Sequence, residues 1–184
     1  MDYCIIPLDN ETSYMLPHPQ QPFNISGRLI PLYDGSVWSY KIELYDSITE
    51  KTYPDESFDP SDYIDNENQA AFLSVYRGEC VGSVRVCRRW NGNAFIDDLS
   101  IDAAHRRHGL GKLLMDAAVM WSREHNLNGV SLETQDNNIA ACMFYLNYGY
   151  VIGGIDTKSY THPSYRGETA LYFYLRDDIY YNKK

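Results

Sequence analysis

The chain has 184 residues, of which 44% are hydrophobic, and carries a formal net charge of −9. This length supports one domain with a sizeable core, and no apolar stretch approaches the roughly 20 residues that a membrane helix needs. Nucleic acid is excluded as a partner, because its binding depends on neutralising phosphates with Lys and Arg. An acidic chain attracts a cationic ligand instead, but the charge alone favours a solvated acidic surface that only keeps the protein soluble. The first residues lack a basic start followed by a long apolar run, so we expect no secretion signal and a cytoplasmic protein.

Cysteine and histidine are placed in a way that favours neither disulfides nor a metal site. The four cysteines form no Cys-x-x-Cys pair and lie at Cys4, Cys80, Cys87 and Cys142. We therefore expect buried thiols in a reducing compartment. His105 and His108 are three residues apart, but no acidic or thiol partner stands beside them at zinc-like spacing, so no metal is expected.

The first third of the chain predicts an irregular start, a strand pair and an acidic loop. Residues 1–24 are rich in Pro, Gln and Asn and show no helical or strand period, so we expect an irregular lead-in there. Residues 25–32 and 37–45 are β-branched and aromatic and are separated by an Asp-Gly turn, which predicts two strands. Residues 52–65 are rich in Pro and Asp and predict an acidic loop.

From residue 70 onward the hydrophobic periodicity predicts a regular succession of strands and helices. Strands are expected over 70–77, 80–90, 94–101, 130–134, 150–155 and 170–175. Amphipathic spacing predicts helices over 110–125 and 138–147. The order is a run of antiparallel strands, then strand–helix–strand–helix–strand, then a final strand. It predicts an α+β sandwich around a mixed sheet, in a single domain over 1–184.

The segment 106–112, Arg-Arg-His-Gly-Leu-Gly-Lys, follows a predicted strand and opens a predicted helix. A helix N-terminus presents unpaired backbone N–H groups and a partial positive charge, which suit an anion. Gly109 and Gly111 let the backbone approach that anion closely, because neither carries a Cβ. The two arginines and the lysine add positive charge to an otherwise acidic chain. A pyrophosphate fits this segment, but a plain glycine turn with a basic helix start gives the same pattern, and for a bare Gly-x-Gly it is the commoner explanation.

Three blocks of the sequence resemble one enzyme family. Residues 106–111 match the Arg/Gln-x-x-Gly-x-Gly/Ala signature of GNAT acetyltransferases, which binds the pyrophosphate of coenzyme A. Residues 138–150 are similar to that family's Asn-x-x-Ala…Tyr-x-x-x-Gly-Phe block, with Tyr150 in place of Phe. Residues 95–101 resemble the family's central bulged strand. The resemblance implies the GNAT fold, a mixed and mostly antiparallel central sheet of about seven strands flanked by helices, with an acetyl-CoA-binding core over 70–155.

The resemblance also implies which residues contact acetyl-CoA. The backbone of Leu99 and Ile101 would contact the pantetheine arm, and the 106–112 turn would contact the phosphates. Asn138 would position the cofactor, and Asn is equally suited to cap the helix that it begins. The implied set is Leu99, Ser100, Ile101, Arg106, Arg107, His108, Gly109, Leu110, Gly111, Lys112, Asn138 and Tyr145.

The chemistry that this family performs is direct transfer of an acetyl group to an amine. An alkyl amine has a pKa near 10.4, so it must lose a proton before it attacks the thioester. A backbone N–H of the bulged strand would stabilise the oxyanion. Asp97 or Asp98 is implied as the helper in deprotonation, acting directly or through water, and strand alternation sends the two to opposite faces. Tyr145 matches the tyrosine that protonates the departing thiolate.

A narrower resemblance points to the acceptor. Residues 132–145 are strongly similar to streptothricin acetyltransferases, and so are 153–157 and several upstream segments. This implies acetylation of an amine in the β-lysine moiety of a polycationic antibiotic. The implied substrate-binding residues are Trp38, Tyr63, Asp65, Asp98 and Glu133. The acidic loop is either a substrate lid or a plain acidic surface, and its carboxylates are Asp55, Glu56, Asp59, Asp62 and Asp65.

Other functions stay open at this point. The acceptor could be another polycationic small molecule, such as a polyamine or an aminoglycoside, or a protein N-terminus. A non-catalytic acyl-CoA-binding sensor is a further alternative, and retention of Asp97, Asp98 and Tyr145 argues against it. Many relatives dimerise, so a homodimer is compatible with the resemblance.

Overall fold

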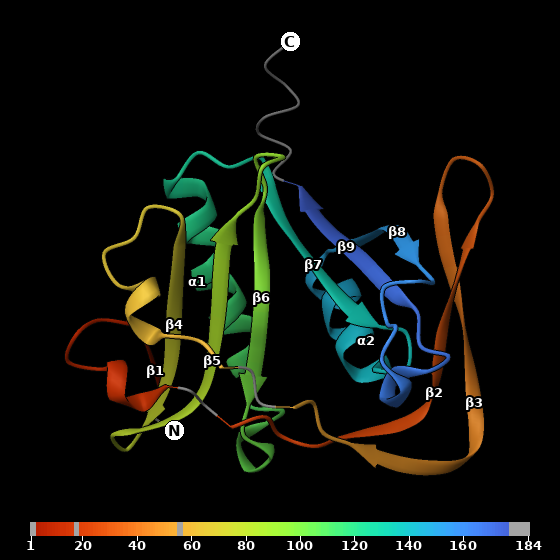
Figure 1. Cartoon of the computed structure of the whole chain (residues 1–184), viewed down its shortest axis with the longest axis horizontal. Coiled ribbons are helices and arrows are strands. Elements are labelled where there is room, and N and C mark those ends of the chain that lie inside the picture. Colours follow the sequence, from red (N-terminus) through yellow and green to blue (C-terminus); the bar gives the residue numbers. More distant parts are fainter. Residues whose placement is uncertain (1–2, 17–18, 55–56, 177–184) are drawn as a thin grey trace. The chain divides into compact units, whose positions relative to one another are not determined.

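The computed structural model describes residues 3–16, 19–54 and 57–176 (Figure 1). Among them, seven strands belong to one sheet and two more form a separate ribbon. The chain divides into two compact units. The first comprises residues up to Gln21 together with Thr52–Val130, and the second comprises Pro22–Lys51 and Ser131–Arg176. The elements confirm the α+β class and the sheet of about seven strands, whereas the single domain over 1–184 stays a prediction.

The first unit is an antiparallel four-strand ladder covered by a long helix (Figure 1). Its strands, in spatial order, are β1 (Tyr3–Pro7), β4 (Gln69–Tyr76), β5 (Glu79–Arg88) and β6 (Ala94–Ile101). Helix α1 (Leu110–Glu124) packs against β4, β5 and β6. The helix does so because its apolar residues recur on one face, where Leu114, Met115 and Ala118 are fully buried.

Strand β1 overturns part of the expected irregular lead-in. Tyr3–Pro7 pair with β4, from Tyr3 opposite Tyr76 to Pro7 opposite Phe72. The sequence Tyr-Cys-Ile-Ile-Pro shows no alternation of apolar and polar residues. The partner strand lies far along the chain, so the pairing left no local signal. After a short 3₁₀ turn at Ser13–Met15, Leu16 is buried in a cluster with Leu73 and neighbouring residues. Pro17 and His18 lie outside the described residues.

The second unit contains the two-stranded ribbon, three strands of the sheet and a helix. The ribbon consists of β2 (Phe23–Tyr33) and β3 (Trp38–Lys51), and the sheet strands are β7 (Gly129–Gln135), β8 (Val151–Asp156) and β9 (Ala170–Arg176), in the order β7-β9-β8. Helix α2 (Ile139–Tyr148) contacts β2, and β3 contacts β8. The helix ends at Gly149, whose φ of +115° is the left-handed conformation that glycine adopts at helix C-termini.

The ribbon is longer than its sequence predicts. Strand β3 continues to Lys51 instead of ending at residue 45, because Ile25 pairs with Thr49 and Phe23 with Lys51 beyond an irregularity in the register. The polar residues at the end of β3 carry no apolar alternation, so only their pairing with β2 reveals the strand. Within the described ranges, no helix combines the length and the apolar character needed to cross a membrane.

Candidate functional site

Strand β6 contains a β-bulge at Asp97, the first of its two candidate carboxylates. In the β5–β6 ladder, Asp98 lies opposite Arg85 and Ile96 lies opposite Val86, so Asp97 stands between these pairs as an extra residue. A bulge interrupts the alternation of side chains along a strand. The prediction that Asp97 and Asp98 point to opposite faces assumed a regular strand, and β6 is not regular at this point. The bulged strand implied by the resemblance is present.

The two carboxylates have different surroundings within the first unit. The Asp97 carboxylate pairs with the Arg89 guanidinium at 3.0 Å, and both side chains are partly exposed. The Asp98 carboxylate is half-buried and accepts a hydrogen bond of 2.9 Å from the Gln20 side-chain amide. Gln20 thus brings the N-terminal segment to the candidate base, and no local pattern in the sequence signals this contact across 78 residues.

The remaining residues of β6 that were implied as cofactor contacts are held in the ladder with β5. Leu99, Ser100 and Ile101 lie opposite Val84, Ser83 and Gly82. Ser100 is buried, whereas Leu99 and Ile101 are half-buried. A Cβ on Gly82 would stand 2.8 Å from the Ser100 carbonyl oxygen, so this glycine allows the two strands to approach at that point.

The 106–112 turn has the geometry of an anion site. Gly109 is the N-cap of α1 with φ +84°, and the first helical hydrogen bond runs from the Leu113 N–H to its carbonyl at 3.2 Å. Within the described part of the chain, the first turn of α1 holds no acidic residue, and Gly109 offers no capping side chain. The leading N–H groups of a helix have no intrahelical acceptor. Such N–H groups suit an anion.

The basic residues of this turn differ from one another in their contacts and backbone conformation. Arg106 donates its Nε–H to the Ile101 carbonyl at 3.1 Å, which fixes the guanidinium beside the end of β6. Arg107 adopts φ +64°, an uncommon conformation for a residue with a side chain. His108 Nδ1 lies 3.2 Å from the His105 carbonyl oxygen. Lys112 pairs with Asp116 one helical turn along, at 2.7 Å on an exposed surface.

Tyr63 and Asp65 lie on the first unit but in a packed environment. The Tyr63 hydroxyl accepts a hydrogen bond from Arg85 at 3.3 Å, and its ring meets Phe58 edge-on at 5.8 Å. Tyr63 packs against the apolar cluster that includes Leu73. Burial raises the pKa of the Tyr63 hydroxyl, opposed by Arg85. Asp65 follows with φ +50° in the turn after the 3₁₀ helix Pro60–Tyr63. These contacts favour a structural role for Tyr63.

In the second unit, Asn138 lies at the start of α2 and Tyr145 lies on its second turn. Asn138 is the N-cap: its side-chain oxygen accepts the Ala141 N–H at 3.2 Å, so the capping role is confirmed. Tyr145 is only 8% exposed, and its ring lies 5.8 Å from those of Tyr150 and Phe173. The tyrosine ring is therefore part of the core of this unit, and a role for the hydroxyl would add to that packing.

Glu133 and Trp38 are also on the second unit. Glu133 accepts a hydrogen bond from the Tyr160 hydroxyl. The sequence did not identify Tyr160 as a partner of Glu133. Burial raises the pKa of the Glu133 carboxyl, and the negative charge of Asp156 raises it further, whereas the Tyr160 hydroxyl lowers it. Trp38 begins β3, and its ring stacks on Tyr33 at 4.8 Å beside the hairpin turn.

The predicted site residues are thus divided between the units. The first unit holds Asp97, Asp98, Leu99, Ser100, Ile101, Tyr63, Asp65 and the 106–112 turn, and the second holds Trp38, Glu133, Asn138 and Tyr145. Among the described residues, no group of three or more His, Cys, Asp or Glu side chains has a metal-binding arrangement.

The cysteines differ from expectation, since only Cys142 is buried. Cys4 is exposed, and Cys80 and Cys87 are half-buried. Burial raises the pKa of both Cys87 and Cys142 to about 12, and for Cys87 the neighbouring Asp97 adds to the effect. Burial likewise raises the pKa of Cys80.

One fast-reacting thiol is therefore expected in the folded protein, because the thiolate is the reactive species and Cys4 alone is exposed. Titration of the native chain with a chromogenic disulfide at pH 8 should modify about one thiol quickly and the others only after denaturation. The Cys4→Ser variant should lose the fast phase. Two or more fast thiols in the wild type would contradict the expectation that the exposed Cys4 alone reacts quickly.

Comparison with known proteins places this geometry in a family. Residues 38–150 match the model of the Acetyltransferase (GNAT) family. Streptothricin acetyltransferase A of Bacillus subtilis (strain 168) is 36% identical over 158 residues, which cover 86% of this chain and 91% of the relative. A streptothricin acetyltransferase of Escherichia coli is 36% identical over 115 residues, or 62% of this chain and 66% of the relative.

Solved structures agree over nearly the whole length. A crystal structure from Bacillus anthracis str. Ames, assigned as a streptothricin acetyltransferase and in complex with acetyl coenzyme A, has a TM-score of 0.85 and 32% identity, and it covers 97% of this chain and 99% of that chain. The crystal structure of nourseothricin acetyltransferase, at 24% identity, has a TM-score of 0.79 over 96% of this chain and 99% of that chain, which supports the fold alone. The chain belongs to the GNAT family and is an acetyl-CoA-dependent acetyltransferase.

Proposed function

We propose that this enzyme inactivates streptothricin-type antibiotics by acetylating an amine of their β-lysine moiety. The observation that carries the proposal is the likeness to streptothricin acetyltransferase A, which extends over 86% of this chain and 91% of that relative. The likeness therefore includes the segments outside the cofactor-binding core, where acceptor specificity resides in a shared fold. The net charge of −9 suits a polycationic acceptor.

The 106–112 turn would hold the pyrophosphate of acetyl-CoA. Its fit to a dianionic group rests on the glycine cap without a side chain, the first helical turn without an acidic residue among those described, and the Arg106 guanidinium anchored on Ile101. Backbone groups of Leu99 and Ile101, together with Ser100, would contact the pantetheine arm, and Asn138 would orient it. When bound, acetyl-CoA supplies an acetyl group activated as a thioester.

Two side chains of this chain would move protons. Asp98 would accept the proton of the acceptor ammonium, directly or through water, because its carboxylate is half-buried and held by Gln20. Asp97 would serve instead to hold the bulge, through its ion pair with Arg89. Tyr145 would donate its hydroxyl proton to the departing thiolate, as its place in the family block implies.

The acceptor would be recognised by acidic and aromatic groups. Glu133 is the strongest candidate, because its partly buried carboxylate lies beside the charge of Asp156 and the hydroxyl of Tyr160, an arrangement that favours an ammonium group. Trp38 and Asp65 would act at the periphery, whereas the contacts of Tyr63 favour a structural role. In the acidic loop, Asp59 caps the 3₁₀ helix by accepting the Ser61 N–H at 2.9 Å. Asp55 and Glu56 lie outside the described residues.

Thiol release from acetyl-CoA tests this function, with streptothricin, spermidine, kanamycin and a short peptide as parallel acceptors. We expect a kcat/KM for streptothricin at least 100-fold above those for the other three, with a product heavier by one acetyl group. Fragmentation of that product should place the acetyl group on the β-lysine moiety. A preference for spermidine or kanamycin would identify another polycationic amine as the substrate, and release with none of them would overturn the proposed acceptor. The cytoplasmic location and the homodimer stay predictions.

A further inference from the structure

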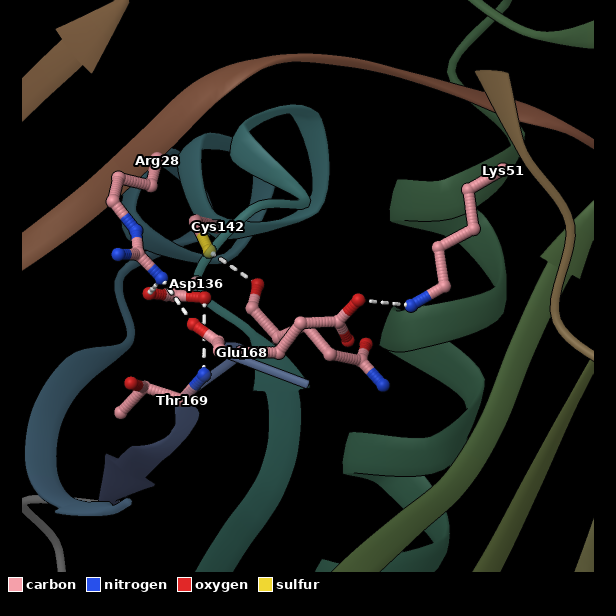
Figure 2. Close-up of polar contacts among 8 residues, drawn as sticks. Arg28, Lys51, Asp136, Cys142, Glu168 and Thr169 are labelled. Atoms are coloured by element: carbon pink, nitrogen blue, oxygen red, sulfur yellow. Dashed lines mark hydrogen bonds and ion pairs between the residues drawn. The ribbon is translucent and has the colours of Figure 1, made fainter. Parts of the chain in front are cut away.

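A network of buried charges surrounds the turn that leads from β7 into α2 (Figure 2). Asp136 lies in this turn and is only 4% exposed. Its carboxylate pairs with the Arg28 guanidinium at 2.8 Å and accepts the Thr169 N–H at 3.1 Å. Its backbone is held as well: its N–H donates to the Thr169 carbonyl at 2.9 Å, and its carbonyl accepts the Leu29 N–H at 2.8 Å. Asp136 thus joins β2, the start of β9 and the β7–α2 turn.

Arg28 connects the ribbon to two segments through one nitrogen. Its Nη2 donates to Asp136 and also to the Gly167 carbonyl at 2.6 Å. Figure 2 shows the guanidinium directed from β2 toward the turn, with Asp136 and Thr169 on its far side. A lysine at this position would keep the charge but lack the branched guanidinium that places Nη2 between the two acceptors.

The turn that Asp136 anchors is the one that carries Asn138. The Asn138 N–H donates to the Gln135 carbonyl at 3.1 Å. The Cys142 thiol, one turn into α2, donates to the same carbonyl at 3.6 Å. The Asn138 side chain caps the helix through Ala141. Asn138 lies two residues after Asp136, so a displacement of Asp136 would also move the backbone of Asn138.

This network is poorly arranged for stability alone. The Nε of Arg28 and the side-chain oxygen of Asn137 are buried and have no hydrogen-bond partner among the described residues. Buried ion pairs seldom stabilise a protein more than packed apolar residues of similar volume, because both charges lose their hydration. Burial indeed raises the pKa of the Asp136 carboxyl despite its hydrogen bond to Thr169 and its pairing with Arg28. Such a network is better explained by the geometry that it fixes.

A second ion pair on the same ribbon provides a comparison. Lys51, the last residue of β3, pairs with Glu168, and the two side chains are 14% and 10% exposed. The side chains of Arg28 and Asp136 are 29% and 5% exposed. Both pairs thus join a ribbon cation to a buried carboxylate, but Glu168 precedes β9 and does not lie in the β7–α2 turn (Figure 2).

We propose that Arg28 and Asp136 are positioning residues for the acetyl-transfer reaction: their ion pair sets the β7–α2 turn so that Asn138 is oriented to bind acetyl-CoA. This inference rests on the proposed contact between Asn138 and the cofactor. Arg28 acts on cofactor affinity through Asn138 and takes no part in proton transfer. Its loss should therefore change binding of acetyl-CoA and leave turnover at saturation nearly unchanged.

The test measures the Kd of acetyl-CoA by calorimetry in the absence of an acceptor, together with kcat, KM and Tm. Arg28→Met and Asp136→Asn should each weaken acetyl-CoA binding about tenfold and change kcat less than about twofold. Lys51→Met serves as the matched control and should lower Tm comparably while leaving the Kd within about twofold of wild type. Arg28→Lys, which keeps the charge and loses the branched guanidinium, should give an intermediate Kd.

A double-mutant cycle with Asn138→Ala distinguishes positioning from a general loss of structure. If Arg28 acts through Asn138, Arg28→Met should have no further effect on the Kd in the Asn138→Ala background. An undiminished effect in that background would overturn the inference, and so would equal weakening by Arg28→Met and Lys51→Met. An Asn138→Ala variant with wild-type Kd would remove the role of Asn138 and this inference with it. Because the Kd is measured without an acceptor, none of these affinity outcomes depends on streptothricin being the substrate.

Discussion

Replacement of Tyr145 by phenylalanine is expected to lower kcat about 100-fold, the lower end of the effect of losing a general acid. The affinity for acetyl-CoA should change less than about twofold, because the ring is retained and its contacts with Tyr150 and Phe173 need no hydroxyl. Turnover under saturating acetyl-CoA and an equilibrium Kd measured separately would check both parts.

Tyr150→Phe is the matched control for this variant. Tyr150 is 2% exposed and contacts Tyr145, and burial raises the pKa of its hydroxyl well above the usual value. Removing this hydroxyl should leave kcat within about twofold of wild type, because Tyr150 has no proposed role in proton transfer. Wild-type turnover in Tyr145→Phe would leave Tyr145 with its packing role alone.

Substitution of Asp98 by asparagine should lower kcat/KM about 100-fold near neutral pH, because the amide cannot accept the proton of the acceptor ammonium. Asparagine keeps the size of the side chain and can still accept the Gln20 hydrogen bond.

Asp97→Asn tests the choice between the two neighbouring carboxylates. It removes the charge that pairs with Arg89. We expect it to reduce kcat/KM less than about tenfold, because a partly exposed ion pair contributes little free energy. A larger loss in Asp97→Asn than in Asp98→Asn would assign the proton transfer to Asp97.

Local patterns in the sequence predicted most of the elements. The spacing of apolar residues gave α1 to within one residue of its end, and the glycines and arginines before it marked a turn with the geometry of an anion site. The Asn138 cap of α2 was likewise readable, because capping depends on residues within one turn. Such features need no knowledge of distant partners.

The features that escaped prediction depend on distant pairings. Strand β1 becomes visible only as the partner of β4. Gln20 meets Asp98 across 78 residues, and Arg28 meets the Gly167 carbonyl across 139. The bulge at Asp97 is a matter of register between two strands, and a single strand of sequence does not specify register. The division of the site residues between two units was equally invisible from periodicity.

Selection for stability is expected to act against the bulge in β6, whereas selection for activity is expected to keep it. Deleting Asp97 would let β5 and β6 pair without interruption, and a continuous ladder leaves fewer backbone groups unpaired. The family resemblance implies, however, that the irregular backbone of this strand would supply the N–H group that meets the oxyanion. Laboratory evolution that rewards heat resistance alone is therefore expected to accumulate regular β6 strands in stable, inactive proteins, whereas selection under antibiotic should retain the extra residue.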